Sequence, residues 1–126
     1  MAYGQDGDYI EGKADADFSI EGTAQYRGAK RTATGIALCA VNDADFAGIL
    51  YNNPRLGQSA SVKRGGSCKG VAGAAFARGA KVTTDANGRF VTATVGQRVH
   101  ATAEQAATAS GDLVALHIRP GLETAP

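Results

Sequence analysis

The feature that most constrains the fold is a pattern repeated in the second half of the chain. A glycine opens a turn, an alternating segment built around a valine follows, and a further glycine closes the unit. Residues 57–66, 79–88 and 111–121 each show this pattern. Short alternating segments between regularly spaced turns are typical of small all-β domains. The sequence therefore predicts a small single-domain β-barrel or β-sandwich with short hairpins and at most one short helix. Three loose matches hint at internal similarity but do not establish a repeat.

Local signals locate several of the strands. Residues 81–84 and 89–95 are rich in β-branched residues and flank a loop whose Asn-Gly pair supplies the positive φ of a hairpin. Residues 113–119 alternate, so Val114, Leu116 and Ile118 should share one face of a strand. Further strands are expected at 18–26, 35–41, 46–51 and 59–62, with a basic turn at 27–31. Residues 103–109 have helical propensity for about two turns, and the sequence leaves open whether 104–109 are helical.

Composition sets the size and class of the domain. The chain has 126 residues, which suits one domain, and much of its 44% hydrophobic content is alanine. A core with so little apolar area often gains stability by association. No apolar run reaches 18 residues, and the N-terminus lacks the features of a signal peptide, so we expect no membrane span and synthesis in a host cytoplasm. Cys39 and Cys68 are then expected to stay reduced.

The formal net charge of +1 conceals an asymmetric distribution. Residues 1–26 carry six acidic side chains against Lys13, whereas residues 27–81 carry nine basic side chains against Asp43 and Asp45. We interpret 1–17 as a flexible acidic arm, 18–121 as the β domain and 122–126 as a tail. The arm is a candidate docking segment, and an ordinary solvated tail is the alternative. The candidate docking residues are Tyr3, Asp6, Asp8, Tyr9, Ile10 and Glu11.

The sequence offers no catalytic equipment. His100 and His117 stand alone, without the paired spacing of a zinc site. Residues 65–70 contain glycines and a lysine but lack the spacing of a phosphate-binding loop. Carboxylates are concentrated in the expected arm, a poor place to hold catalytic geometry. We therefore expect no enzyme activity, no cofactor and no metal.

The alternative from another functional class is nucleic-acid binding by the basic segment 27–81. Aromatic rings in or next to this segment could stack on bases, and its lysine and arginine side chains could contact phosphates. The residues concerned are Arg27, Lys30, Arg31, Arg55, Lys63, Arg64 and Lys69, with Tyr26, Phe46 and Tyr51. The near-neutral overall charge and the acidic arm argue against it. A third possibility, a glycan-binding module, lacks a visible aromatic platform in the sequence.

The order of segments resembles the head-decoration or capsid-cement proteins of tailed phages. Residues 46–50 followed by 57–62 resemble that family's apolar strand, loop and Gly-x-x-x-x-Val unit. Residues 77–82 with 85–89 are similar to its hairpin, and 106–121 to its closing strand. The similarity covers roughly residues 35–121.

The resemblance implies a compact β domain that binds the outside of a capsid. Its partners would be the major capsid protein and further copies of itself, with a trimer favoured and a dimer possible, and it would have no catalytic residues. A protein that binds across several capsid subunits opposes their separation, and a symmetric oligomer adds avidity. The expected location is the exterior of a virion, with the N-terminal arm ordering on the shell.

Overall fold

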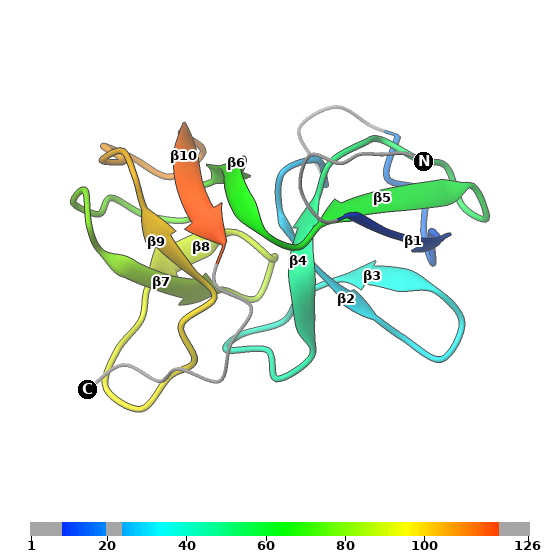
Figure 1. Cartoon of the computed structure of the whole chain (residues 1–126), viewed down its shortest axis with the longest axis horizontal. Coiled ribbons are helices and arrows are strands. Elements are labelled where there is room, and N and C mark those ends of the chain that lie inside the picture. Colours follow the sequence, from blue (N-terminus) through cyan, green and yellow to red (C-terminus); the bar gives the residue numbers. More distant parts are fainter. Residues whose placement is uncertain (1–8, 20–23, 119–126) are drawn as a thin grey trace.

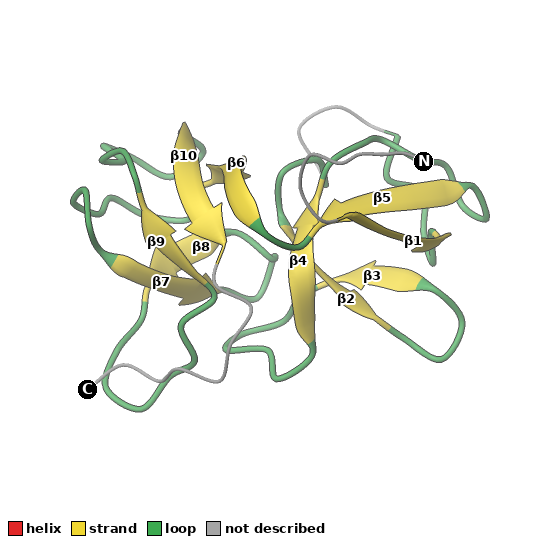
Figure 2. Cartoon of the chain, viewed as in Figure 1, coloured by secondary structure: helices red, strands yellow, loops and turns green. Residues whose placement is uncertain are grey.

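The structure is a computed structural model that describes residues 9–19 and 24–118. Ten strands occur there, in two antiparallel sheets that lie side by side (Figure 1). Figure 2 shows strands and loops alone in the described part of the chain. No helix in this part could cross a membrane. The predicted all-β class is confirmed, as a small single domain whose two sheets are not closed into a barrel.

The first sheet contains strands β1 to β5 in the order β1-β5-β4-β2-β3. The strands are β1 Tyr9–Lys13, β2 Gly28–Arg31, β3 Ile36–Leu38, β4 Phe46–Leu50 and β5 Ser59–Lys63. All its neighbouring strands are antiparallel.

The second sheet contains strands β6 to β10 in the order β6-β10-β9-β7-β8. The strands are β6 Gly66–Val71, β7 Lys81–Thr84, β8 Phe90–Thr92, β9 Ala101–Ala103 and β10 Leu113–Ile118. Strands β6 to β10 occupy the same places in this sheet as β1 to β5 in the first, so the two sheets have the same topology. An isolated parallel bridge also links the edge strands in both, Ala14 with Ile36 and Ala72 with Phe90.

The correspondence extends to backbone hydrogen bonds outside the strands. Ala14 N donates to Gln58 O at 2.8 Å, and Ala72 N donates to Asp112 O at 2.8 Å. Gly57 N and Gly111 N donate to the carbonyls of the same two alanines, at 3.0 and 2.7 Å. Both glycines have positive φ, 82° and 95°. The chain is therefore an internal structural repeat, with a first repeat over β1–β5 and a second over β6–β10.

The strand signals in the second half of the sequence hold in the structure. β7 and β8 pair as the predicted hairpin, with Thr84 opposite Phe90 and Val82 opposite Thr92. Asp85 Oδ1 accepts hydrogen bonds from the backbone N–H groups of Asn87 and Arg89, which stabilises the turn. In β10 the buried residues are Val114, Leu116 and Ile118, as the alternation predicts. That face packs into the core of the second repeat.

Each repeat has its own apolar cluster. In the first, Ile36, Leu50 and Val62 pack with Phe18 and several alanines. In the second, Phe90 and Leu116 pack with the alanines of β9 and its neighbours. Ile49 of β4 belongs to the second cluster although it lies in the first repeat.

Contacts between the repeats hold them together. Gly28 N donates to Gly88 O at 2.7 Å, and Asn42 N donates to Thr84 O at 3.0 Å. The Phe46 ring stacks on His100 with centroids 4.2 Å apart and meets Phe90 edge-on at 6.3 Å. Because apolar packing and backbone hydrogen bonds both cross the junction, the two sheets form one folded unit.

Three local expectations are corrected. Residues 9–13, expected in a flexible arm, form β1 and pair with β5 along its whole length. Residues 27–31 are not a turn, because β2 covers Gly28–Arg31 and buries Ala29 while the Lys30 ammonium reaches Asp43 at 3.2 Å. Residues 18–19 and 24–26 form no strand, and 20–23 lie outside the described residues.

The stretch with helical propensity is not helical. The backbone N–H and carbonyl of Ala107 both pair with Phe76, at 2.9 and 3.0 Å. Asp112 Oδ2 accepts hydrogen bonds from the N–H groups of Thr108 and Ala109. These partners satisfy the backbone groups that a short helix would use, so tertiary context overrides propensity here.

Candidate functional site

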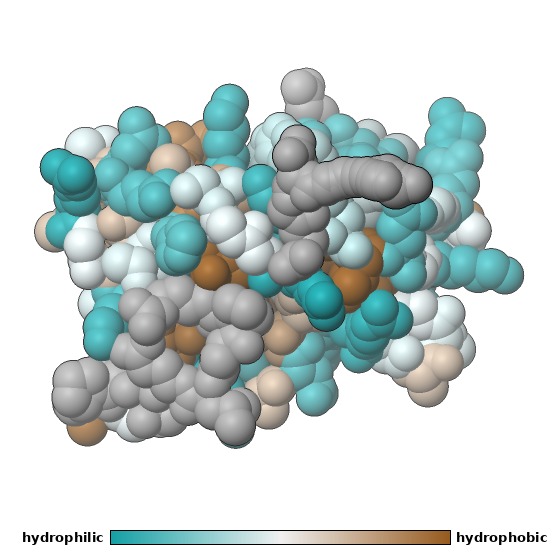
Figure 3. All heavy atoms as spheres, in the orientation of Figure 1, coloured by the Kyte–Doolittle hydropathy of each residue, from teal (hydrophilic) through white to brown (hydrophobic). Residues whose placement is uncertain are grey.

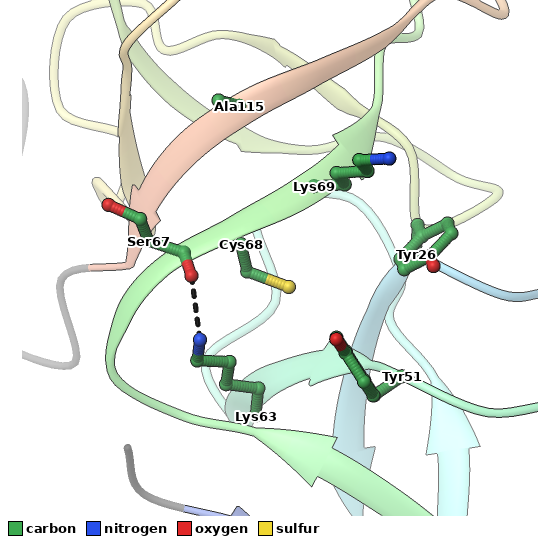
Figure 4. A pocket seen from close by; sticks show the side chains of 7 residues that line it. All are labelled: Tyr26, Tyr51, Lys63, Ser67, Cys68, Lys69 and Ala115. Atoms are coloured by element: carbon green, nitrogen blue, oxygen red, sulfur yellow. Dashed lines mark hydrogen bonds between the residues drawn. The ribbon is translucent and has the colours of Figure 1, made fainter. Parts of the chain in front are cut away.

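A cavity of about 330 Å³ lies where the two repeats meet. It is lined by Tyr26, Tyr51, Lys63, Ser67, Cys68, Lys69 and Ala115. Tyr26 lies just before β2, Tyr51 just after β4, and Lys63 at the end of β5. The other residues come from β6 and β10 of the second repeat. Figure 4 shows the two tyrosines facing Lys63, Ser67 and Cys68. We call this site the junction cavity.

Three tyrosine rings form an aromatic cluster beside this cavity. Tyr51 lies at its centre, with ring centroids 5.6 Å from Tyr9 and 6.0 Å from Tyr26. Both pairs are edge-to-face, with interplanar angles of 78° and 84°, a favourable geometry for aromatic rings. Tyr9 and Tyr51 are each 43% exposed, so the cluster is in part open to solvent.

Two ammonium groups give the cavity positive charge. Lys63 Nζ donates to Ser67 O at 2.7 Å and lies 5.9 Å from the centroid of the Tyr9 ring, within range of a cation–π interaction. Lys69 is exposed, and its side chain lies above Tyr26 in the view of Figure 4. The seven lining residues include no carboxylate.

Carboxylates lie on both flanks of the junction cavity. On one side Glu11 accepts a hydrogen bond from Ser59 Oγ at 2.9 Å. Glu11 shares the outer face of β1 with Tyr9. On the other side Glu104 accepts a hydrogen bond from Ser67 Oγ at 3.0 Å. Acidic groups therefore lie beside the cavity as well as its two lysines.

Tyr26 adopts a backbone conformation that side chains of its kind rarely occupy. Its φ is 67°, in the left-handed region, where a bulky residue is strained. The matching position in the second repeat is Gly79, with φ 88°. Hydrogen bonds from Tyr26 N to Leu50 O, at 2.7 Å, and from Val71 N to Tyr26 O, at 3.0 Å, hold the residue in place. The strain is thus located at the wall of the cavity.

The thiols and histidines form no catalytic arrangement. Burial raises the pKa of the Cys68 thiol in spite of the nearby Lys63 ammonium, and burial also raises the pKa of Cys39. Both cysteines are free and buried, and a protonated thiol is a poor nucleophile. His100 is buried against Phe46, and His117 is exposed on β10. Within residues 9–19 and 24–118, no group of three His, Cys, Asp or Glu side chains could hold a metal ion.

The predicted docking residues fall into two groups. Tyr3, Asp6 and Asp8 lie outside the described residues. Tyr9, Ile10 and Glu11 belong to β1, where Ile10 packs against the first apolar cluster and the other two lie on the outer face. The structure therefore brings Tyr9 to the junction cavity, a placement that the sequence did not predict.

The residues of the nucleic-acid hypothesis are only partly brought together. Tyr26, Tyr51, Lys63 and Lys69 meet at the junction cavity. Phe46 packs against the second apolar cluster and stacks on His100, and Lys30 is paired with Asp43. The sequence interpretation grouped Tyr26 with Tyr51 but missed Tyr9, because the three tyrosines are far apart in the chain and come together only through the pairing of β1, β5, β4 and β2. A possible signal was the three isolated tyrosines among strands otherwise poor in aromatic residues.

No protein-family model matches the chain, and no curated protein sequence matches it significantly. The structure is similar to the crystal structure of the N base of head fiber gp8.5 in bacteriophage phi29, with a TM-score of 0.68. The likeness covers 93% of this chain and 98% of that one, at 17% sequence identity. At this level of sequence identity the likeness concerns the fold, and it extends over nearly the whole of both chains.

Proposed function

We propose that this protein is a structural, non-enzymatic component of a phage virion that binds the outer surface of the capsid and stabilises the shell. The observation that carries the proposal is the likeness to the head-fiber base, which spans nearly the full length of both chains. The strand-and-turn motifs of residues 35–121 point to the same class of protein from the sequence alone.

The physical character of the domain supports this role. Two repeats with separate clusters and a packed junction make a rigid body. On the face shown in Figure 3, the described residues are largely hydrophilic, and apolar residues emerge there in small, separate patches. Stable attachment to a shell would then rely on several small contacts, which a homo-oligomer multiplies by engaging several capsid subunits. A trimer is the oligomer we favour.

The acidic N-terminal segment is our candidate for the docking element. Residues 9–13 are part of the first sheet, so the docking role is assigned to the residues before them, including Tyr3, Asp6 and Asp8. A deletion of residues 1–8 tests this role without removing β1. Full-length protein should bind capsids that lack it, and the deletion variant should bind more weakly. Undiminished binding by the variant would exclude the segment as the anchor.

Electron microscopy of virions with and without the protein tests the main proposal. We expect added density on the capsid exterior, and sedimentation analysis should show an oligomer in solution. Heating both kinds of particle and measuring DNA release separates cementing from simple attachment, since a cement raises the release temperature. Absence of added density on the exterior would contradict the proposal.

Nucleic-acid binding remains the second candidate, favoured by the meeting of Tyr26 and Tyr51 with Lys63 and Lys69. Titration with a single-stranded oligonucleotide at increasing salt tests it, because phosphate contacts predict a steep loss of affinity. No detectable binding at low salt would exclude this function.

A further inference from the structure

We propose that the junction cavity binds one acidic sugar residue, a pyranose ring that carries a carboxylate. The ring would lie against the tyrosines, and the carboxylate would meet the ammonium groups of Lys63 and Lys69. This activity is separate from capsid attachment and does not depend on it.

The dimensions of the cavity favour a single small ring. Ligand pockets in proteins typically measure ~300–1,000 Å³, and this one, at about 330 Å³, is at the small end of that range. It is also open to solvent at the surface, where Tyr51 is 43% exposed. A terminal or side-branch sugar could therefore enter while the rest of a glycan stays outside.

The aromatic cluster provides the surface that a sugar ring needs. Aromatic faces carry negative electrostatic potential, so they attract the polarised C–H groups of a pyranose ring, while the phenol hydroxyls can exchange hydrogen bonds with sugar hydroxyls. Tyr51 is held edge-on by Tyr9 and Tyr26, which fixes its ring before a ligand arrives. Preorganisation of this kind reduces the entropic cost of binding.

The distribution of charge selects a single anion over a polyanion. Lys63 and Lys69 lie within the cavity, and no carboxylate lines it. Glu11 and Glu104 lie on its two flanks, bonded to Ser59 and Ser67. A nucleic acid strand that crossed the cavity would bring further phosphates towards these carboxylates. One carboxylate that points inwards would gain the attraction without that repulsion, so the geometry favours an acidic sugar.

The backbone of Tyr26 is the independent observation. A left-handed φ of 67° is costly for tyrosine, and the second repeat uses Gly79 at the same place. Local strain of this kind is concentrated at binding and active sites, where the side chain has a use that offsets it. The Tyr26 ring also lines the cavity on the side of the first repeat, as the Tyr51 ring does. The ring also packs against the second apolar cluster, and we assign it contact with the sugar in addition to this packing.

Titration of the full chain with glucuronate and N-acetylneuraminate, followed by ¹⁵N NMR, tests the proposal. Glucose and an oligothymidylate serve as comparison ligands. We expect saturable shifts at cavity residues with at least one acidic sugar, and weaker binding of glucose. Tyr26→Gly should weaken acidic-sugar binding by about tenfold, equivalent to about 1.4 kcal/mol, and Lys69→Gln should also weaken it. Arg55→Gln, at an exposed site outside the cavity lining, is the matched charge control and should bind as the parent does.

Tyr26→Gly is designed to retain the fold, because Gly79 shows that glycine suits this backbone position. If its thermal unfolding were nevertheless abnormal, Lys69→Gln alone would decide, since Lys69 is exposed. The proposal is overturned if no acidic sugar gives saturable shifts, if glucose binds equally well, or if these variants bind as the parent does. Tighter, steeply salt-dependent binding of the oligothymidylate would assign the cavity to nucleic acid instead.

Discussion

Tyr26 and Gly79 occupy the same position in the two repeats. The N–H of Tyr26 donates to Leu50 O at 2.7 Å, and the N–H of Gly79 donates to Ala103 O at 2.8 Å. Leu50 and Ala103 are themselves equivalent, since each pairs with a buried residue of the strand next to it, Val62 and Leu116. The two repeats thus have the same backbone conformation at this position and differ in the side chain. The fold requires the positive φ, and the tyrosine ring is an addition that lines the junction cavity.

The first prediction measures the backbone cost directly. A Cβ added at Gly79 meets no atom within 4 Å, so Gly79→Ala should introduce backbone strain and little else. We expect a loss of about 1 kcal/mol in the free energy of unfolding, the usual order of a left-handed penalty, with a smaller loss for Gly79→Asn. Denaturant unfolding measures both. Equal stability of the alanine variant and the parent would show that the position tolerates side chains freely and that Tyr26 is unstrained.

The second prediction concerns the attachment of β1. A Cβ added at Gly35 would collide with the backbone carbonyl of Lys13, at the end of β1. Gly35→Ala should therefore displace this strand and lower the free energy of unfolding by about 2 kcal/mol or more. Gly57→Ala is the control for backbone strain alone: its φ of 82° should cost about 1 kcal/mol, but its added methyl group meets no atom within 4 Å. Faster hydrogen exchange at Ile10 and Gly12 in the Gly35 variant alone would confirm the effect, and unchanged exchange there would contradict it.

The sequence predicted three strands of each repeat, and both its successes and its failures have physical reasons. β10 alternates cleanly, and the β7–β8 hairpin has β-branched residues and an Asn-Gly turn, so local signals and tertiary pairing agree. β2 contains a glycine and two basic residues, a composition that predicts a turn. Its Gly28 is required by packing, because a Cβ there would lie 2.7 Å from Thr84 Cγ2. No pattern in the neighbouring sequence predicts such a contact between the repeats.

The repeat itself escaped detection because only scattered equivalent positions, such as Ala14 with Ala72, keep the same residue, and many others do not. Asn42 and Gly96 both have positive φ, at matching points of the loops before β4 and β9. Phe18 N donates to Pro54 O much as Phe76 N donates to Ala107 O, but proline has no N–H for the return bond that Ala107 makes. The geometry is retained while the residues change. The junction cavity was equally hidden, because its residues come from both repeats.

The third prediction tests whether the two repeats unfold as one unit. Ile49 is fully buried in the cluster of the second repeat although it belongs to β4 of the first. Ile49→Ala should lower the free energy of unfolding by about 2–5 kcal/mol, and Ile49→Val by about 0.5–1.5 kcal/mol. Hydrogen exchange should quicken in β7 to β10 as well as in β4. If hydrogen exchange quickened in the first repeat alone, the two repeats would not unfold as one unit.

The fourth prediction is a loss of stability in mild acid that arises at His100. Burial lowers the pKa of this imidazole to about 4, with a smaller opposing effect of Asp43, and Nε2 has no hydrogen-bond partner. An unfolded histidine titrates near pH 6.5. Between these values the unfolded chain binds a proton that the folded chain does not, so stability must fall as the pH falls from about 6.5 to about 4. The expected loss is on the order of 2–3 kcal/mol.

Replacement of His100 by phenylalanine should remove that slope, because the aromatic ring can still stack on Phe46 and carries no titrating group. The variant's free energy of unfolding should then be nearly constant between pH 6.5 and pH 4.5, apart from the carboxylates that titrate at the lower end. His117→Gln, at an exposed position on β10, is the control and should keep the slope of the parent protein. Urea unfolding at a series of pH values measures all three proteins. A slope retained in His100→Phe would mean that another group takes up the proton, since the buried imidazole is then absent.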